Sequence, residues 1–420
     1  MDFAPTEKVA LLRDQVEKFF ATDILPRHPT WCESSEDQAR GTPAFMHELR
    51  AKAYEMGLWN LGLPNLRDDE PGTRLTNLEF APLAEIMGRL PWAPQVFNCH
   101  APEVPNMEIL QLFASPEQRE AYLKPLLEGQ IRSSFAMTEP AVASSDATNI
   151  ATRIERQGDK YVINGRKWFA SNAGNPETRF LIVVGITNPE AKRGRQHSLI
   201  IVPKDTPGLT VVRSLPVLHH VDRATPHSEV LFENVTVPVS ARLGEEGAGF
   251  VIGQARLGPA RVHHCMRAIG RAEVLLRLMV ERINDREAFG ARLRSYSNIT
   301  DAVAESRIEL EQSRLLVQRT AWLLDQEGNK AARKDVSLIK IAVARMYHNI
   351  ADRGIQMFGA MGLTDDAPFA SALAQARAFR IYDGPDEVHL RTIYRLEERE
   401  ALSDNQRLSS HFLRGPGATA

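Results

Sequence analysis

The fold is decided by the stretch VHHCMRAIGRAEVLLRLMVERI, residues 262–283. Apolar side chains recur in it every three to four positions, which places them on one face of a helix of about six turns. The apolar face comprises Val262, Cys265, Met266, Ile269, Ala272, Leu276, Met279, Val280 and Ile283. A helix this long with one apolar face must pack against other helices, so the stretch predicts a helical bundle.

Helical patterns lie on both sides of this stretch. Downstream, one helix is predicted over roughly residues 301–324 and another over 336–350, because apolar residues again recur at three-to-four spacing. Upstream, residues 9–20 show the same spacing, and Ser115-Pro116-Glu117-Gln118 has the composition of a helix N-terminus. We therefore expect helices before residue 130 and after residue 249.

The pattern between residues 161 and 237 is different, because short β-rich runs replace the helical spacing. These runs are 161–163, 180–184, 198–202, 209–212 and 229–232. Asn164-Gly165 predicts a hairpin turn, and Pro207-Gly208 predicts a second turn. The sequence thus predicts an α+β protein: an N-terminal all-helical domain (1–130), a central β domain of barrel or sandwich type (131–245) and a C-terminal four-helix bundle (246–420).

The composition argues against several classes of protein. The chain has 420 residues, with 51 Lys and Arg against 53 Asp and Glu, so its net charge of −2 gives no general attraction for nucleic acid. Its three cysteines are far apart, which argues against a disulfide framework or a structural zinc site. No secretory signal or membrane-length apolar run is recognisable. We expect a bacterial cytoplasmic protein that does not insert into membranes.

The sequence gives little support for the common catalytic, nucleotide-binding and metal-binding motifs. The chain contains neither a P-loop nor a G-x-S-x-G motif. Gly247-Ala248-Gly249 lacks the third glycine of a dinucleotide fingerprint, since Ile252 stands there. His263 and His264 are adjacent on the predicted helix and point about 100° apart, so they are poorly placed to share an ion. We expect no metal site.

Five motifs carry a more specific signal. In chain order they are Thr138-Glu139-Pro140, the stretch 164–172 (NGRKWFASN), Arg286-Glu287-Ala288-Phe289-Gly290, the stretch 356–362 (QMFGAMG) and Tyr382-Asp383-Gly384. This ordered set resembles the acyl-CoA dehydrogenase family from about residue 10 to residue 400. Within that family, the chain most resembles the subfamily that comprises acyl-CoA dehydrogenase family members ten and eleven. Three stretches carry this resemblance: Gly258-Pro259-Ala260-Arg261, His263-His264-Cys265 and residues 383–389 (DGPDEVH).

The resemblance implies a function in fatty acid metabolism and β-oxidation. A member of this family binds FAD and desaturates an acyl-CoA: a base removes the α-proton, and the β-hydrogen leaves as hydride to the flavin. The implied partners are the acyl-CoA substrate and an electron-transfer flavoprotein as electron acceptor. A homodimer or homotetramer is also implied.

The resemblance also assigns site residues. The implied flavin contacts are Met137, Thr138, Ser145, Phe169, Ser171, Arg286, Phe289, Gln356, Gly359, Pro385 and Glu387. The implied substrate contacts are Ser144, Arg261, Tyr382 and Gly384. Phe169 stands in place of the family's usual Trp and Ser171 in place of Thr; both keep an aromatic face or a hydroxyl. Arg286 and Gln356 are expected to act across a subunit interface.

Asp383 is the predicted catalytic base, where the family commonly has Glu. Asp is shorter by one C–C bond, about 1.5 Å, and a misplacement of about 1 Å can cost roughly a hundredfold in rate. Either the backbone or the substrate must therefore lie closer here, or the carboxylate abstracts a proton from a different position. Some branches place the base on the helix of Arg261, at the position of Ala260, but alanine cannot accept a proton.

Other functions remain open on the sequence alone. Nitroalkane oxidases share the fold and also resemble this pattern, with Asp as the base and no need of a CoA pocket. A flavin-bearing, DNA-associated relative would require a basic surface, which the net charge does not suggest. A purely structural helical protein would not need the ordered flavin motifs. The sequence does not specify the length or branching of the acyl chain.

Overall fold

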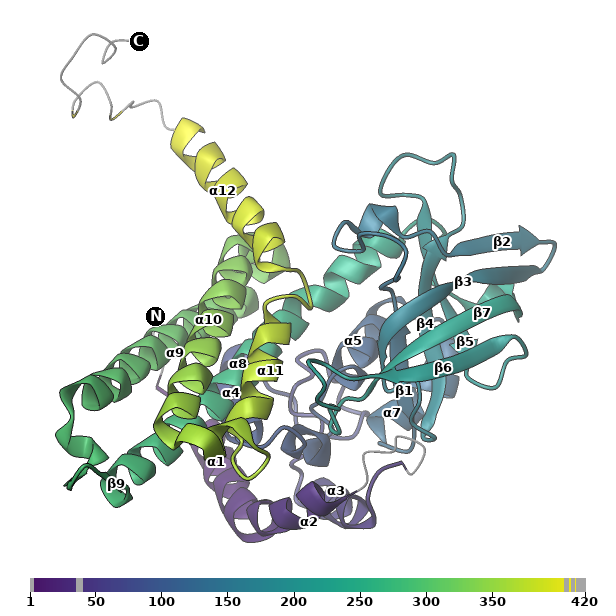
Figure 1. Ribbon diagram of the computed structural model, residues 1–420. Coiled ribbons are helices and arrows are strands. Elements are labelled where there is room, and N and C mark those ends of the chain that lie inside the picture. Colours follow the sequence, from purple (N-terminus) through teal and green to yellow (C-terminus); the bar gives the residue numbers. More distant parts are fainter. Residues whose placement is uncertain (1–3, 35–40, 404–407, 409–411, 413–420) are drawn as a thin grey trace.

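The computed structural model describes residues 4–34, 41–403, 408 and 412, which form a helical body with a β domain at one side (Figure 1). The N-terminal helices are α1 (Glu7–Phe19), α2 (His28–Glu33), α3 (Ala44–Glu55), α4 (Asn77–Gly88), α5 (Glu103–Phe113), α6 (Pro116–Gln118) and α7 (Lys124–Leu127). The predicted N-terminus at Ser115 is confirmed: Ser115 and Gln118 form a capping box, with Pro116 in the first turn.

The central part of the chain forms one sheet. Its strands are β1 (Arg132–Ala136), β2 (Arg153–Gln157), β3 (Lys160–Ser171), β4 (Thr178–Ile186), β5 (His197–Pro203), β6 (Leu209–Leu215), β7 (His227–Pro238) and β8 (Arg242–Leu243). The strand order is β6-β7-β3-β2-β4-β5-β8, and β1 pairs in parallel with β4. All five predicted β-rich runs lie in strands, whereas β1, β2 and β8 were not predicted.

Strand β4 shows how the sheet joins the rest of the molecule. Its side chains alternate between the two faces, as the strand period of two requires. Phe180, Ile182 and Val184 pack in a core shared with α5 and α7, while Leu181 and Val183 pack in the core on the sheet's other face. Both faces are therefore buried, which explains why this run is apolar throughout.

The predicted hairpin at Asn164-Gly165 is wrong. These residues lie inside β3, and the turn between β2 and β3 is at Gly158-Asp159. The pairing of β3 with β7 shifts register between Ile163 and Gly165, so the dipeptide marks a β-bulge. A Cβ on Gly165 would lie 2.5 Å from Oγ1 of Thr152, so glycine is required for close approach rather than for a turn. The predicted turn at Pro207-Gly208 is confirmed between β5 and β6.

The C-terminal part is the predicted helical bundle. It contains α8 (Gly249–Asp285), α9 (Ser297–Ala331, broken at Gly328), α10 (Arg333–Phe358), α11 (Phe369–Phe379) and α12 (Asp386–Ser403); a small hairpin of β9 (Glu287–Ala288) and β10 (Ala291–Arg292) follows α8. Helices α8, α9 and α10 pack against one another, and α11 packs on α10. Helix α12 extends away from the body (Figure 1). The α+β fold class is confirmed, and the domain boundaries at 130/131 and 245/246 stay predictions.

Helices α4 and α8 approach each other closely, and this contact fixes the position of α8. A Cβ on Gly270 would lie 1.8 Å from the backbone oxygen of Glu85, and a Cβ on Gly88 would lie 2.2 Å from that of Arg267. Only glycine fits at either position. Within the described ranges, no helix is both long enough and apolar enough to cross a membrane.

Candidate active site

Asp383 lies in the turn between α11 and α12. Its backbone has φ 55°, a left-handed conformation that Asp and Asn adopt more readily than most residues, and Gly384 follows with φ 104°. The backbone oxygen of Asp383 accepts a hydrogen bond of 2.7 Å from Nε of Arg261 on α8. It also lies 3.2 Å from Nε2 of His389 on α12. Side chains from two helices therefore hold the turn.

The Asp383 carboxylate is mostly buried, yet one of its oxygens makes no hydrogen bond with the described residues. Its side chain is 17% exposed, and Oδ2 lies 3.4 Å from Nε2 of His264. The geometry of that contact falls short of a hydrogen bond, so Oδ2 has no hydrogen-bond partner among the described residues. An enclosed carboxylate oxygen with free lone pairs can accept a proton.

Lys340 supports the turn from α10. Its buried ammonium donates to the backbone oxygen of Phe379 and lies 4.4 Å from the centre of the Phe379 ring and 5.3 Å from that of Tyr382. Burial lowers the pKa of Lys340 to about 8, although the Asp383 carboxylate opposes the shift. The ammonium thus contributes positive charge beside the carboxylate.

A second group of predicted residues lies at the β domain. Phe169 sits at a bulge between Lys167 and Ala170 of β3, with φ 50°, and the residue is 42% exposed. The Oγ of Ser171 lies 3.0 Å from Nδ1 of His227. The loop after β1 is tied to β3 because the Trp168 backbone N–H donates to the oxygen of Thr138 at 3.0 Å.

This group offers what a flat, polar, heteroaromatic ligand needs. An exposed aromatic face at Phe169 can stack on it, and the Ser171 hydroxyl can hydrogen-bond to it. The indole Nε1 of Trp168 is buried without a hydrogen-bond partner among the described residues, so its N–H is available to donate to a ligand. The residues present therefore fit the isoalloxazine ring of FAD. Of the loop serines, Ser145 is exposed, whereas Ser144 Oγ accepts the Glu139 backbone N–H at 2.9 Å.

A third group lies at the opposite end of the bundle. Arg286, Phe289, Gln356 and Gly359 are all exposed, and Phe289 is fully so, with φ 52°. The guanidinium of Arg282 lies 5.2 Å from the ring centre of Phe358, so the ends of α8 and α10 are neighbours. The hairpin of β9 and β10, which follows Arg286, lies on the opposite side of the molecule from β3, the strand that contains Phe169 (Figure 1). Their side chains are therefore open to contact with another molecule.

Comparisons with known proteins decide the family. Residues 6–130, 134–235 and 247–396 match the N-terminal, middle and C-terminal domains of acyl-CoA dehydrogenase. The chain belongs to the acyl-CoA dehydrogenase family. It is therefore an oxidoreductase of an FAD-dependent family.

Several relatives cover nearly the whole chain. The protein named Probable acyl-CoA dehydrogenase FadE2 of Mycobacterium tuberculosis is 49% identical over 94% of this chain and 97% of its own length. Acyl-CoA dehydrogenase family member 11 of Gallus gallus is 48% identical over 91% of this chain, which spans only 49% of that relative. A solved acyl-CoA dehydrogenase structure from Mycobacterium abscessus superposes with a TM-score of 0.91 at 45% identity, covering 94% of this chain and 99% of that one.

Several side chains around the Asp383 turn were not predicted to belong to the site. His264, Arg267, Lys340 and His389 all lie around the Asp383 turn but were not singled out as site residues. One signal was available: Arg261 and His264 are three positions apart on one helix, which places them on the same face. Within the described ranges, no three His, Cys, Asp or Glu side chains are placed to hold a metal ion.

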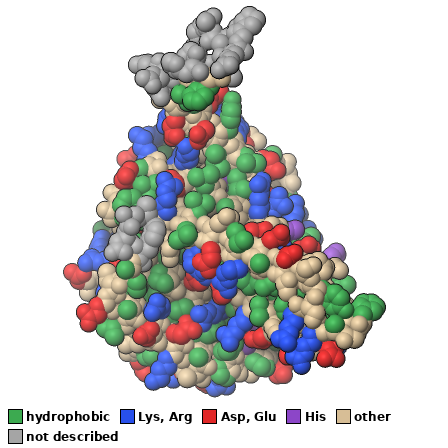
Figure 2. Space-filling model, turned by 90° about the vertical axis from the view of Figure 1, so that its left-hand side faces the viewer, with side chains coloured by type: hydrophobic (Ala, Val, Ile, Leu, Met, Phe, Trp, Pro, Cys, Tyr) green, Lys and Arg blue, Asp and Glu red, His purple; other side chains and the backbone are tan. Residues whose placement is uncertain are grey.

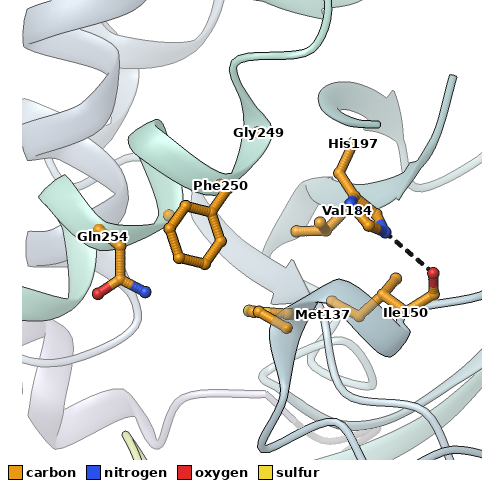
Figure 3. A pocket seen from close by; sticks show the side chains of 9 residues that line it. Met137, Ile150, Val184, His197, Gly249, Phe250 and Gln254 are labelled. Carbon is orange, nitrogen blue, oxygen red and sulfur yellow. Dashed lines mark hydrogen bonds between the residues drawn. The ribbon is translucent and has the colours of Figure 1, made fainter. Parts of the chain in front are cut away.

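A small cavity separates the start of α8 from the β domain (Figure 3). It measures about 10 Å³ and is lined by Met137, Ile150, Val184, His197, Phe250 and Gln254, among others. The Nε2 of His197 lies 3.0 Å from the backbone oxygen of Ile150 at its edge. Because the cavity holds at most about one water, it is a packing gap beside Met137 rather than a ligand site.

Glu108 on α5 is a buried carboxyl whose proton should make stability depend on pH. Burial raises its pKa to about 8, although the Arg256 guanidinium opposes the shift, and Oε2 has no hydrogen-bond partner among the described residues. The folded protein thus retains a proton that the unfolded chain loses above about pH 4.5, so stability falls as pH rises from about 4.5 to 8. Glu108→Gln, which cannot ionise, should exceed the wild type in stability at pH 8 by on the order of a few kcal/mol, but not at pH 4. Urea unfolding at both pH values checks this; equal differences at the two would contradict it.

Proposed function

We propose that this chain is an FAD-dependent acyl-CoA dehydrogenase that desaturates the α,β bond of an acyl-CoA, with Asp383 as the base. The observation that carries the proposal is the enclosed Asp383 carboxylate, whose Oδ2 lacks a hydrogen-bond partner among the described residues while Arg261 and His389 hold its backbone. A general base needs a held position and a free lone pair, and the held backbone and the free Oδ2 atom of Asp383 support the proposal.

The proposed reaction moves one proton onto the chain. Oδ2 of Asp383 takes the α-proton of the acyl group, and Arg261 keeps the turn from moving by holding the Asp383 backbone oxygen. Tyr382 and Gly384 flank the base in the same turn and would line the thioester; we also keep Ser144 as a proposed substrate contact. Bound FAD would supply the acceptor for the β-hydrogen, which leaves as hydride.

The chain would hold FAD with residues from two copies. We propose that Met137, Thr138, Ser145, Phe169 and Ser171 of one copy contact the isoalloxazine side, together with Pro385 and Glu387 at the start of α12. Arg286, Phe289, Gln356 and Gly359 of a second copy would contact the adenine and pyrophosphate side. Their exposure at the far end of the bundle supports this arrangement.

A homodimer or homotetramer follows from the same proposal. The bundle side of the molecule (Figure 2) includes α12, on which Leu390, Tyr394 and Leu402 are exposed apolar residues.

We further propose that an electron-transfer flavoprotein reoxidises the cofactor. A solved structure described as the electron-transferring flavoprotein of Acidaminococcus fermentans superposes with a TM-score of 0.81 at 25% identity, covering 95% of this chain and all of that one. The three free cysteines support a reducing, cytoplasmic compartment.

Anaerobic spectral titration tests the function. The purified protein should show a bound-flavin absorption spectrum that bleaches with one member of a panel of saturated, 2-methyl and 4-hydroxy acyl-CoAs. Bleaching follows because α-proton removal and hydride transfer reduce the flavin. The responding thioester also identifies the chain class.

Two results would contradict the proposal. A flavin that stays oxidised with every thioester but bleaches with a nitroalkane would assign the function to a nitroalkane oxidase. A preparation that binds no flavin, even after incubation with FAD, would exclude both enzymes.

A further inference from the structure

His264 on α8 is hydrogen-bonded to a neighbouring arginine in a way that fixes its ring proton. Nη2 of Arg267 lies 3.0 Å from Nδ1 of His264. A guanidinium can only donate, so Nδ1 accepts and carries no proton. Burial lowers the pKa of His264 well below its usual value, and the Arg267 and Lys340 charges lower it further. The neutral ring therefore carries its one proton on Nε2.

The protonated nitrogen of His264 faces the Asp383 carboxylate. Nε2 lies 3.4 Å from Oδ2, the oxygen that lacks a hydrogen-bond partner among the described residues. The distance is slightly longer than an ordinary N–H···O bond, as is common in active sites without substrate, where such bonds tighten on binding. A donor and an acceptor thus face each other across the site.

The ring and the arginine are themselves held. The His264 ring packs edge-on against Tyr382, with centroids 5.2 Å apart, and against Phe379 at 6.3 Å. Nη1 of Arg267 donates to the backbone oxygen of Cys99 at 3.1 Å. A continuous series of contacts therefore runs from the N-terminal helical part through Arg267 and His264 to Asp383.

We propose that His264 is a positioning residue, which fixes the Asp383 carboxylate through an Nε2–H donor whose tautomer is set by Arg267. The inference rests on the proposed role of Asp383 as the base. It gives a physical reason why the shorter Asp can serve here: a donor on α8 restricts the carboxylate to one orientation within the reach of its side chain.

A neutral histidine suits this role better than a cation. A protonated imidazole would form an ion pair with the carboxylate and make it a weaker base, whereas a neutral N–H orients it with a smaller effect. Other groups also act on the carboxylate. The charged and titratable side chains that interact electrostatically with Asp383 are Arg256, Arg261, Cys265 and Arg267 of α8, Lys340 of α10, Tyr382 of the turn and His389 of α12.

A pair of amide substitutions separates the two ring nitrogens. His264→Asn places an amide near Nδ1 only, so it can still accept from Arg267 but withdraws the donor from Asp383. His264→Gln places its NH₂ group near Nε2 and restores the donor. In the FAD-loaded protein, His264→Asn should reduce the rate of anaerobic flavin reduction by roughly tenfold to a hundredfold. His264→Gln should recover most of that loss.

The pH profile and ligand affinity show whether the effect passes through the base. With His264→Asn, the acidic limb of the rate–pH profile should move upward by about one pH unit, because a carboxylate that loses a donor is protonated more readily. Affinity for the enoyl-CoA product, measured by its perturbation of the flavin spectrum, should not change. His263→Asn is the matched control: His263 is adjacent but packs against Phe80, and its Nε2 has no partner among the described residues.

The outcomes distinguish this inference from the proposed function. An unchanged rate and profile in His264→Asn, or a His264→Gln variant no better than His264→Asn, overturns the positioning role while leaving Asp383 as the base. Equal losses in His263→Asn also overturn it. If His264→Asn fails to fold or to retain FAD, comparison of His264→Gln with wild type decides, because a shifted profile there contradicts the inference. Asp383→Asn with wild-type flavin reduction would instead overturn the proposed function.

Discussion

Asp383→Asn should abolish flavin reduction by an acyl-CoA while leaving FAD bound. Asparagine cannot take the α-proton, and loss of a general base costs roughly a hundredfold to ten-thousandfold in rate. The backbone should not move, because Asn tolerates the left-handed conformation at φ 55° and its backbone oxygen can still accept from Arg261. Stopped-flow absorbance under anaerobic conditions measures the reduction, and the flavin-to-protein absorbance ratio measures cofactor content.

Asp383→Glu is the matched control for this experiment. It restores a carboxylate but extends it by about 1.5 Å, and Glu is less suited than Asp to a left-handed turn. We therefore expect a rate between those of Asp383→Asn and wild type. If Asp383→Asn reduced its flavin at the wild-type rate, the base would have to be another group.

Local signals predicted the elements but not their assembly. The apolar spacing of residues 262–283 predicted α8, and the Ser115 motif predicted a helix N-terminus, because both patterns act within a few residues. Asn164-Gly165 misled for the opposite reason: glycine there is required by Thr152, thirteen residues earlier, and not by a turn. The Asn-Gly dipeptide looks the same in a sequence whether its glycine is required by a turn or by the close approach of another residue.

The candidate site was predictable only in part. The motif containing Asp383 was recognised, but Arg261 lies 122 residues away along the chain, and its contact with the Asp383 backbone oxygen depends on how α8 and α11 pack. His264 and Lys340 contact the same turn from two different helices, and no local sequence pattern predicts that they lie close together. The role proposed for Phe289, which is exposed in the single chain, also lies beyond any local pattern, because its proposed ligand would be held by another copy of the chain.

Gly270→Ala should destabilise the protein by about 2–4 kcal/mol, although alanine is normally the better helix former by about 1 kcal/mol. The added methyl group would lie 1.8 Å from the backbone oxygen of Glu85, and backbone cannot rotate away as a side chain can. Helices α4 and α8 must then separate, and α8 carries Arg261 and His264. Urea unfolding of the FAD-loaded protein measures the stability, and flavin reduction should slow in parallel because the contacts to Asp383 shift with the helix.

Gly253→Ala on the same helix tests whether the effect comes from the contact or from the substitution itself. Gly253 is also within α8, but a Cβ there would meet nothing within 4 Å, and the residue borders the small cavity beside Met137. This substitution should raise stability by about 0.5–1 kcal/mol, since only the helical preference of alanine and a partly filled gap remain. Opposite signs for the two variants identify the α4–α8 contact as the constraint that sets the position of α8. A Gly270→Ala variant as stable as Gly253→Ala would show that the two helices can separate freely, and that the geometry around Asp383 does not depend on their approach.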